Sequence, residues 1–411
     1  MKTYAPVTEA VLDALKTIVG AEYVLTEPEK LEQYQTDEET DPRKFHLPEA
    51  VVLPKDAQEI AAVIKLANTY DVPVTVRSGG TSLAGGAIPV CGGIVLLMER
   101  LNKIIELNAE GMYMEVEAGV RTVDIQKYAN EAGFLYAGDP CSAESCLIGG
   151  NIATNAGGNK AVRYGVTRDQ VYADEVVTPT GEIVELGARL KKKSTGYCLE
   201  QLIMGSEGTL GIITKATLKL QPIPPYRFDL LAVFSDPEQA LDVVPKIMQA
   251  GINPTSVEYM DNSYVRGTAE YLEFKGAPHY ENGIYVIITV ETFSEDELDL
   301  KMEQLDELCS AAGAVDVLEA DERIWDMRRN CQESVRLISL VSLTDDVVVP
   351  VNEIAGTIKF IMKIGEKYPF PVKINAHIGD GNISPGRRAG DHAHDQGGDG
   401  PAADFEPGQD L

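Results

Sequence analysis

The stretch RSGGTSLAGGA, from Arg77 to Ala87, decides how this chain folds. It follows the apolar run 73–76, PVTV, which predicts a buried strand. Four glycines alternate with hydroxyl side chains, so backbone N–H groups can converge on an anion without Cβ clashes. The pattern is neither G-x-G-x-x-G nor G-x-x-x-x-G-K-[ST], so it fits neither a Rossmann fingerprint nor a P-loop. By itself the stretch predicts a diphosphate-binding loop about as well as an ordinary surface loop.

Two further glycine-rich stretches follow. The first, GDPCSAESCLIGGNIATNAGGNKAVRYG, runs from Gly138 to Gly165, and small residues dominate it. The second, GSEGTLGIIT from Gly205 to Thr214, leads into a strand predicted to begin near Ile212. Such a bare backbone permits the close approach of a flat ligand, whereas the plainer interpretation is a set of tight turns. Because these stretches occur together in one domain, we favour the ligand.

The surrounding segments predict alternating strands and helices. A short apolar strand at 51–53 precedes a helix that Asp56 caps, with Glu59 completing a capping box. A hairpin is predicted from Glu175 to Leu186, and the segment 138–158 is expected to consist of turns. Residues 1–45 have apolar side chains at the helical period, which predicts a helical lead-in.

A change of pattern divides the chain. The prolines of QPIPP, at 222, 224 and 225, predict a domain boundary. Beyond them, the order strand-helix-strand-strand-helix-strand is that of a ferredoxin-like module. The segment from Pro385 to Leu411 contains six Gly, five Asp and three Pro, so it cannot bury enough apolar surface to order itself. We expect that tail to be disordered.

Composition excludes several classes of protein. A chain of 411 residues is too long for one compact core, and 44% apolar with 24% charged residues is typical of a globular protein. The formal charge of −28 argues against nucleic acid as a partner and against an anionic membrane surface. No apolar run is long enough to span a membrane, and no signal peptide is evident. Six cysteines without C-x-x-C spacing favour reduced thiols in the cytoplasm.

Together the three glycine-rich stretches resemble those of FAD-binding oxidoreductases of the vanillyl-alcohol oxidase type, in particular D-lactate dehydrogenases and the flavoprotein subunit of glycolate oxidase. The resemblance implies an α+β fold in which two subdomains, here residues 46–224, hold FAD beneath a ferredoxin-like cap. The cap would occupy residues 225–384 and be incomplete at its C-terminal end. The lead-in, 1–45, would precede the FAD-binding subdomains, and the tail, 385–411, would follow the cap. The implied FAD contacts are Arg77, Ser78, Gly79, Gly80, Thr81, Ser82, Gly85, Pro140, Gly149, Gly150, Thr154, Gly158, Glu207, Gly208 and Ile213.

The same resemblance suggests two catalytic residues in the cap. Arg328 matches the arginine of a W-x-x-R motif that grips the substrate carboxylate, although a solvated basic turn is the plainer interpretation. His377, in NAHIGDGN, matches the first histidine of H-x-G-D-G-N-x-H, where two histidines often bind a divalent metal such as zinc or iron. Ser384 replaces the second histidine, which weakens the case for a metal, and a lone histidine is more often structural. We interpret Cys141 and Cys146 as small packing residues.

The resemblance implies FAD-dependent oxidation of a 2-hydroxy acid, of the D-lactate or glycolate type, to the 2-oxo acid. Without an Fe–S ligand cluster, electrons would pass to an external acceptor: a quinone, a ferredoxin-type protein or an electron-transferring flavoprotein. A Gly-Glu-His-Gly segment that supplies a catalytic histidine in relatives is not recognisable after Ser384, and the pattern there looks truncated or frame-shifted. A flavin-holding subunit or a catalytically impaired relative is therefore an alternative. A sugar or alcohol oxidase of the same superfamily is a third, and Arg328 argues against it.

Overall fold

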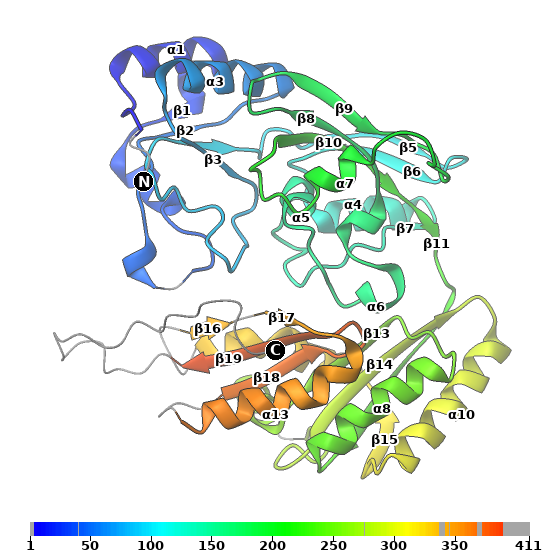
Figure 1. Cartoon of the computed structure of the whole chain (residues 1–411). Helices are drawn as coiled ribbons and strands as arrows, with labels where there is room; N and C mark the ends of the chain where they lie inside the picture. The colour runs from blue at the N-terminus through cyan, green and yellow to red at the C-terminus, as the bar shows by residue number, and fades with distance from the viewer. Residues whose placement is uncertain are drawn as a thin grey trace.

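The computed structural model describes residues 4–39, 41–274, 276–336, 342–344, 346–367 and 372–388, which form two domains (Figure 1). Among the described residues, the N-terminal domain contains two larger sheets and a two-stranded sheet of β7 and β11, and the C-terminal domain is built on one large sheet. The chain passes from one to the other where strand β11, Gln221–Pro222, is followed by β12, Tyr226–Phe234. This is where the proline-rich boundary is predicted.

The first sheet has the order β1-β2-β4-β3. Strands β2, β4 and β3 run parallel, and β1 pairs antiparallel with β2. The lead-in is therefore not only helical, because it also contributes β1 to this sheet. Asp56 caps α3 by accepting a hydrogen bond from Glu59 N, but the Glu59 carboxylate binds Lys55 N, one residue before the expected position. The elements are α1 (Glu9–Val19), β1 (Val24–Leu25), α2 (Pro28–Leu31), β2 (Ala50–Val52), α3 (Ala57–Tyr70), β3 (Val74–Arg77) and β4 (Ile94–Leu97).

The second sheet is antiparallel throughout, in the order β5-β6-β10-β8-β9. Strands β8 and β9 form the predicted hairpin. Apolar side chains from both sheets share one buried core, which joins the two subdomains. The strands are β5 (Ile104–Asn108), β6 (Tyr113–Glu117), β8 (Val171–Val177), β9 (Ile183–Gly187) and β10 (Ile212–Lys219); α4 (Thr122–Glu131), β7 (Phe134–Leu135), α5 (Ile148–Thr154), α6 (Ala161–Tyr164) and α7 (Leu199–Ile203) connect them.

The C-terminal domain confirms the ferredoxin-like prediction. Its first four strands have the spatial order β15-β12-β14-β13, with α8 and α10 as the crossover helices. An additional helix, α9, lies between β13 and β14 in the sequence. The bounds are α8 (Pro237–Gln249), β13 (Ser256–Met260), α9 (Asn262–Tyr271), β14 (Ile284–Thr292), α10 (Glu295–Ala311) and β15 (Asp316–Glu319).

Later segments extend this sheet beyond β13 in the order β18-β19-β16, and β17 pairs with β19. Strand β19 continues to Arg388, so the expectation of disorder is wrong for residues 385–388: backbone pairing with β18 does not depend on apolar side chains. The remainder of the predicted tail, 389–411, lies outside the described residues. The added elements are α11 (Glu322–Arg329), α12 (Cys331–Arg336), β16 (Ser342–Thr344), β17 (Val347–Val348), α13 (Ile354–Gly365), β18 (Val372–His377) and β19 (Asn382–Arg388).

Two apolar cores cover the two faces of the cap sheet. Helices α8, α10 and α13 contribute to the core on one face, and α9, α11 and α12 to the core on the other. Glu258 on β13 and His377 on β18 alternate with residues of the first core, so their side chains lie on the opposite face. In Figure 1 the cap sheet lies beneath the N-terminal domain, with α6 between them.

Candidate active site

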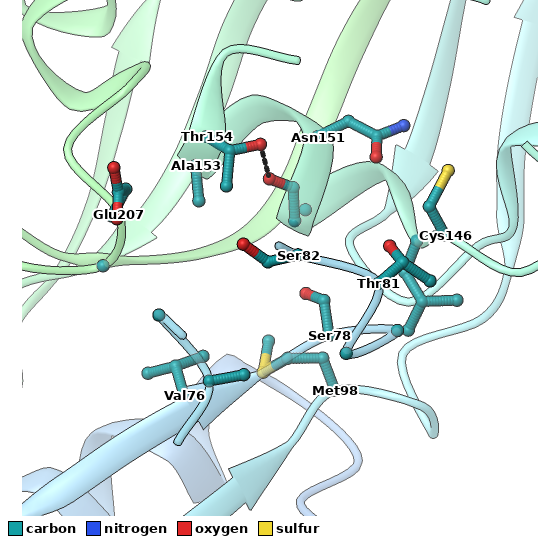
Figure 2. A pocket seen from close by; sticks show the side chains of 18 of the residues that line it. Val76, Ser78, Thr81, Ser82, Met98, Cys146, Asn151, Ala153, Thr154 and Glu207 are labelled. Carbon is teal, nitrogen blue, oxygen red and sulfur yellow. Dashed lines mark hydrogen bonds between the residues drawn. The ribbon is translucent and has the colours of Figure 1, made fainter. Parts of the chain in front are cut away.

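A cavity of about 210 Å³ lies where the three glycine-rich stretches meet (Figure 2). The stretch after β3 forms one wall, α5 forms a second, and the loop that precedes β10 forms a third. Most of the predicted FAD contacts line it: Ser78, Gly79, Gly80, Thr81, Ser82, Gly149, Gly150, Thr154, Glu207, Gly208 and Ile213.

Glycines allow the walls to approach one another. A Cβ on Gly79 would lie 2.6 Å from the Ser145 carbonyl oxygen, and one on Gly150 would lie 2.9 Å from Ser78 Cβ. Real Cβ atoms do not tolerate such contacts, so the first stretch can pack on α5 only if these positions lack side chains. The glycines at these positions are therefore required for packing within the protein, in addition to their predicted role in binding a ligand.

The helix α5 was not expected in the segment 138–158. It is seven residues long, and Thr154 Oγ1 donates a hydrogen bond to Gly150 O at 3.0 Å within it (Figure 2). It ends at Asn155, whose φ of 50° is left-handed. Glycines at 149 and 150 disfavour a helix by propensity, but here tertiary packing outweighs them.

Four predicted FAD contacts do not line the cavity: Arg77, Gly85, Pro140 and Gly158. Arg77 instead donates from Nη1 to the carbonyl oxygen of Thr36 at 2.6 Å, which ties the loop to the lead-in. A Cβ on Gly158 would lie 2.0 Å from the Asp139 carbonyl oxygen, so the absence of a side chain there lets two segments of the chain approach closely. Arg77 and Gly158 therefore support the segments that line the cavity but do not contact the cavity themselves.

Sequence reasoning missed several residues that line the cavity. Val76 and Met98 follow from topology, because β3 and β4 are parallel neighbours whose carboxyl ends meet at one edge. The others lie inside the two later glycine-rich stretches, which sequence analysis identified as a whole without singling out these residues: Ser142, Cys146, Leu147, Asn151, Ala153, Ala156, Gly211 and Ile212.

A second group of functional side chains lies in the cap. Glu258, Arg328 and His377 come from β13, α11 and β18, and they form one buried cluster. Glu258 Oε2 accepts from Arg328 Nε at 2.9 Å and from Arg328 Nη2 at 2.7 Å. His377 Nδ1 lies 2.8 Å from each carboxylate oxygen of Glu258. The structure therefore brings the two predicted catalytic residues together, through a glutamate that the sequence did not single out.

Electrostatics favours the charged forms of all three groups. Burial alone would lower the pKa of His377, but the adjacent Glu258 carboxylate outweighs it and raises that pKa to about 10. Burial would raise the pKa of Glu258, and the two cations beside it hold it below its usual value instead. Burial likewise opposes the charge on Arg328, yet Glu258 raises its pKa. The cluster consequently carries one net positive charge near neutral pH.

Cys141 lies between this cluster and the cavity lining, because its thiol interacts with His377 and the next residue, Ser142, lines the cavity. Desolvation raises the pKa of this thiol, but the hydrogen bond and charge of His377 outweigh that effect and lower the pKa. The residue is exposed to solvent, so it is not the packing residue that we expected. Cys146 is buried, with its sulfur 3.2 Å from Thr122 Oγ1, and it also lines the cavity.

The residues around His377 do not fit the metal site that the resemblance allowed. Ser384, at the position of the second histidine, donates its hydroxyl proton to the Asp346 carboxylate. Across the ranges that the structure describes, no three His, Cys, Asp or Glu side chains are grouped to hold a metal ion. We derive no chemistry from a metal here.

Comparison with known proteins decides the family. Residues 48–187 match the model described as FAD binding domain, and residues 223–386 match FAD linked oxidases, C-terminal domain. D-lactate dehydrogenase of Anaerostipes hadrus is 37% identical over 392 residues, which cover 92% of this chain and 81% of that protein. The chain belongs to the FAD-linked oxidase family. It is thus an FAD-dependent oxidoreductase, and the family resemblance inferred from the three stretches is confirmed.

Other comparisons agree. The glycolate oxidase subunit GlcD of Bacillus subtilis (strain 168) is 34% identical over 349 residues, 84% of this chain and 74% of that subunit. The crystal structure of p-cresol methylhydroxylase with substrate bound has a TM-score of 0.79 at 18% identity, covering 94% of this chain and 85% of that one. It establishes the fold, which is the predicted vanillyl-alcohol oxidase type. No helix in the described ranges has the length and apolar composition to cross a bilayer.

Proposed function

We propose that this protein oxidises a small 2-hydroxy acid to the corresponding 2-oxo acid, using FAD held in the cavity. The observation that carries the proposal is the buried Arg328–Glu258–His377 cluster, which adjoins the cavity through Cys141. Its net positive charge suits a substrate with one carboxylate. The names of relatives support the same class of substrate, since D-lactate and glycolate are both small 2-hydroxy acids.

FAD fits the cavity because glycine backbone and hydroxyl groups line one part of it and apolar side chains, including Val76, Met98 and Ile213, line another. Glycines allow these walls to lie close together. Ser78, Thr81 and Ser82 would donate hydrogen bonds to the pyrophosphate, and Gly149 and Gly150 would leave room for the cofactor to lie against α5. When bound, FAD supplies the acceptor for the hydride from the substrate. The clashes described above for Gly79 and Gly150 explain why side chains of the protein cannot replace these glycines around the cavity.

The chain's own residues would bind and orient the substrate. Glu258 engages Nε and Nη2 of Arg328, which leaves Nη1 to hold the substrate carboxylate. His377, kept cationic by Glu258 and hydrogen-bonded to Cys141, would place its positive charge beside the substrate. In this charge state His377 binds an anion better than it accepts a proton.

We propose that the electrons then pass to an external acceptor, either a quinone or an electron-transferring protein. The six cysteines are free, and none belongs to a group that could hold a metal within the described residues. The free thiols also support our proposal of a cytoplasmic location.

The test is anaerobic mixing of the purified holoprotein with D-lactate, L-lactate, glycolate, sugars and simple alcohols, followed by the flavin absorbance. Bleaching by a 2-hydroxy acid, and not by sugars or alcohols, is the expected result. Bleaching by sugars alone would instead favour a sugar oxidase. An unchanged spectrum with every 2-hydroxy acid would favour the alternative, a flavin-holding chain without dehydrogenase activity. Reoxidation of the bleached protein by quinones or electron-transfer proteins then identifies the acceptor.

A further inference from the structure

Glu258 occupies an unusual position in the cap. It is fully buried in β13, where its direct cross-strand partner is His377 of β18. Its one carboxylate binds two cationic side chains, Arg328 through two nitrogens and His377 through Nδ1. Burying a carboxylate lowers the stability of the folded protein unless the group is paired and hydrogen-bonded. Both oxygens of Glu258 have hydrogen-bond donors.

The arrangement determines which atoms remain available. Glu258 fixes Nδ1 of His377 as the donor toward the strand, because a carboxylate can only accept. It also fixes the plane of the Arg328 guanidinium by holding Nε and Nη2. Each cation is left with one nitrogen that Glu258 does not use: the second ring nitrogen of His377 and Nη1 of Arg328.

The competing explanation is that Glu258 is structural and only joins α11 to the sheet. The Arg328–Glu258 pair would be enough for that role, without a histidine that also contacts Cys141, the neighbour of the cavity residue Ser142. We propose that Glu258 is the positioning residue of the active site, orienting both His377 and Arg328 toward the substrate. This inference deepens the proposed function and rests on it only for the kinetic part of its test.

The first experiment does not depend on turnover. The chain has five histidines, so a protein with ¹⁵N-labelled histidine gives few imidazole resonances, and His377→Gln identifies the one from His377. In the wild-type holoprotein Nδ1 of His377 should be protonated, and Glu258→Gln should shift its resonance. Glu322→Gln is the matched control, because Glu322 is an exposed partner of Arg329 on the same helix as Arg328. A His377 resonance that is the same in Glu258→Gln and wild type would overturn the proposal.

The second experiment measures the rate of flavin reduction in single turnovers. Glu258→Gln keeps the side chain's size and should slow reduction by about 10- to 100-fold, the usual cost of losing a residue that orients a functional histidine. In a His377→Gln background the same substitution should cost less, because the part of its effect that passes through His377 is already lost and only the part through Arg328 remains. Equal losses in both backgrounds would mean that Glu258 does not orient His377, which would overturn the proposal.

The two proposals fail in different ways. If the wild-type flavin is not reduced by any 2-hydroxy acid, the proposed function is wrong, and the imidazole resonances still decide the role of Glu258. If Glu258→Gln does not fold, Glu258→Asp retains the charge at the same strand position. It should give an altered His377 resonance with FAD still bound, whereas a wild-type resonance would contradict the proposal.

Discussion

Gly79 shows how a single residue determines the shape of the cavity. Any side chain there would meet the Ser145 carbonyl oxygen at 2.6 Å, so the loop after β3 would have to move away from the segment that precedes α5. Two walls of the cavity would then no longer fit closely around the cofactor.

Gly79→Ala should therefore lower the FAD content of the purified protein and destabilise it by about 1–3 kcal/mol, as overpacking generally does. Gly157→Ala is the matched control, since a Cβ at that position has nothing within 4 Å. Flavin absorbance per polypeptide and urea denaturation measure both effects. Equal FAD content in the two variants would contradict the steric argument.

Asp174, on β8, is a second residue with a measurable consequence. It is buried, and neither of its carboxylate oxygens has a hydrogen-bond partner. Burial, with a smaller contribution from the nearby Glu200, raises its pKa to about 8. Between roughly pH 4 and pH 8 the unfolded chain has released this proton while the folded protein retains it, so stability falls as the pH rises through that window.

Asp174→Asn should remove this dependence. We expect the stability of the variant relative to the wild type to increase from pH 5 to pH 8, by at most about 1.4 kcal/mol per pH unit, because only the wild type must keep a proton bound to fold. Urea denaturation at both pH values measures the difference. A constant difference across pH would mean that Asp174 does not titrate in this range.

At the scale of elements, the short helix α6 connects the two domains. Arg163 Nη1 donates to the Glu291 carbonyl oxygen at 2.6 Å and to Thr255 Oγ1 at 3.2 Å, both in the cap. A Cβ on Gly379, in the turn that follows His377, would lie 2.9 Å from Val162 Cγ2. Helix α6 thus contacts both β14 and the turn that follows His377, a proposed substrate-binding residue.

Arg163→Met should weaken this docking. Loss of two hydrogen bonds from a charged donor should cost about 1–3 kcal/mol, and hydrogen–deuterium exchange should increase in α6 and at the end of β14. Arg266→Met, at an exposed position of α9, provides the control. Unchanged exchange in Arg163→Met would show that other contacts hold the domains together.

Elements differ in how well sequence predicts them. The β8–β9 hairpin and the ferredoxin-like strand order follow from periodicity and turn residues, which are local properties. Helix α5 was missed because its stability comes from packing against Ala118 and Ser78, which lie far away in the sequence. Glu258 was missed for the same reason: in sequence it is one acidic residue among many, and only the pairing of β13 with β18 places it beside His377.

At the scale of the whole molecule, acidic residues dominate. The formal charge is −28, and α10 alone places Glu295, Asp299 and Glu303 on exposed positions one turn apart. Like charges at this spacing repel one another, and so does the surface as a whole at low salt.

Raising NaCl from 10 to 300 mM should therefore raise the Tm, because the shorter Debye length screens this repulsion. Asp299→Lys should be more stable than the wild type at 10 mM, by a few tenths of a kcal/mol, since the lysine lies between two glutamates. The advantage should shrink at 300 mM. A Tm that is independent of salt in both proteins would show that self-repulsion does not limit stability.

Because main-chain atoms make up much of the cavity's surface around α5, protein engineers have little freedom there. Replacing a glycine or alanine adds bulk before it can add a useful interaction, so altered redox behaviour or selectivity is hard to obtain from that side. The cap presents charged side chains on regular strands and a helix instead, and directed changes of specificity are better introduced there.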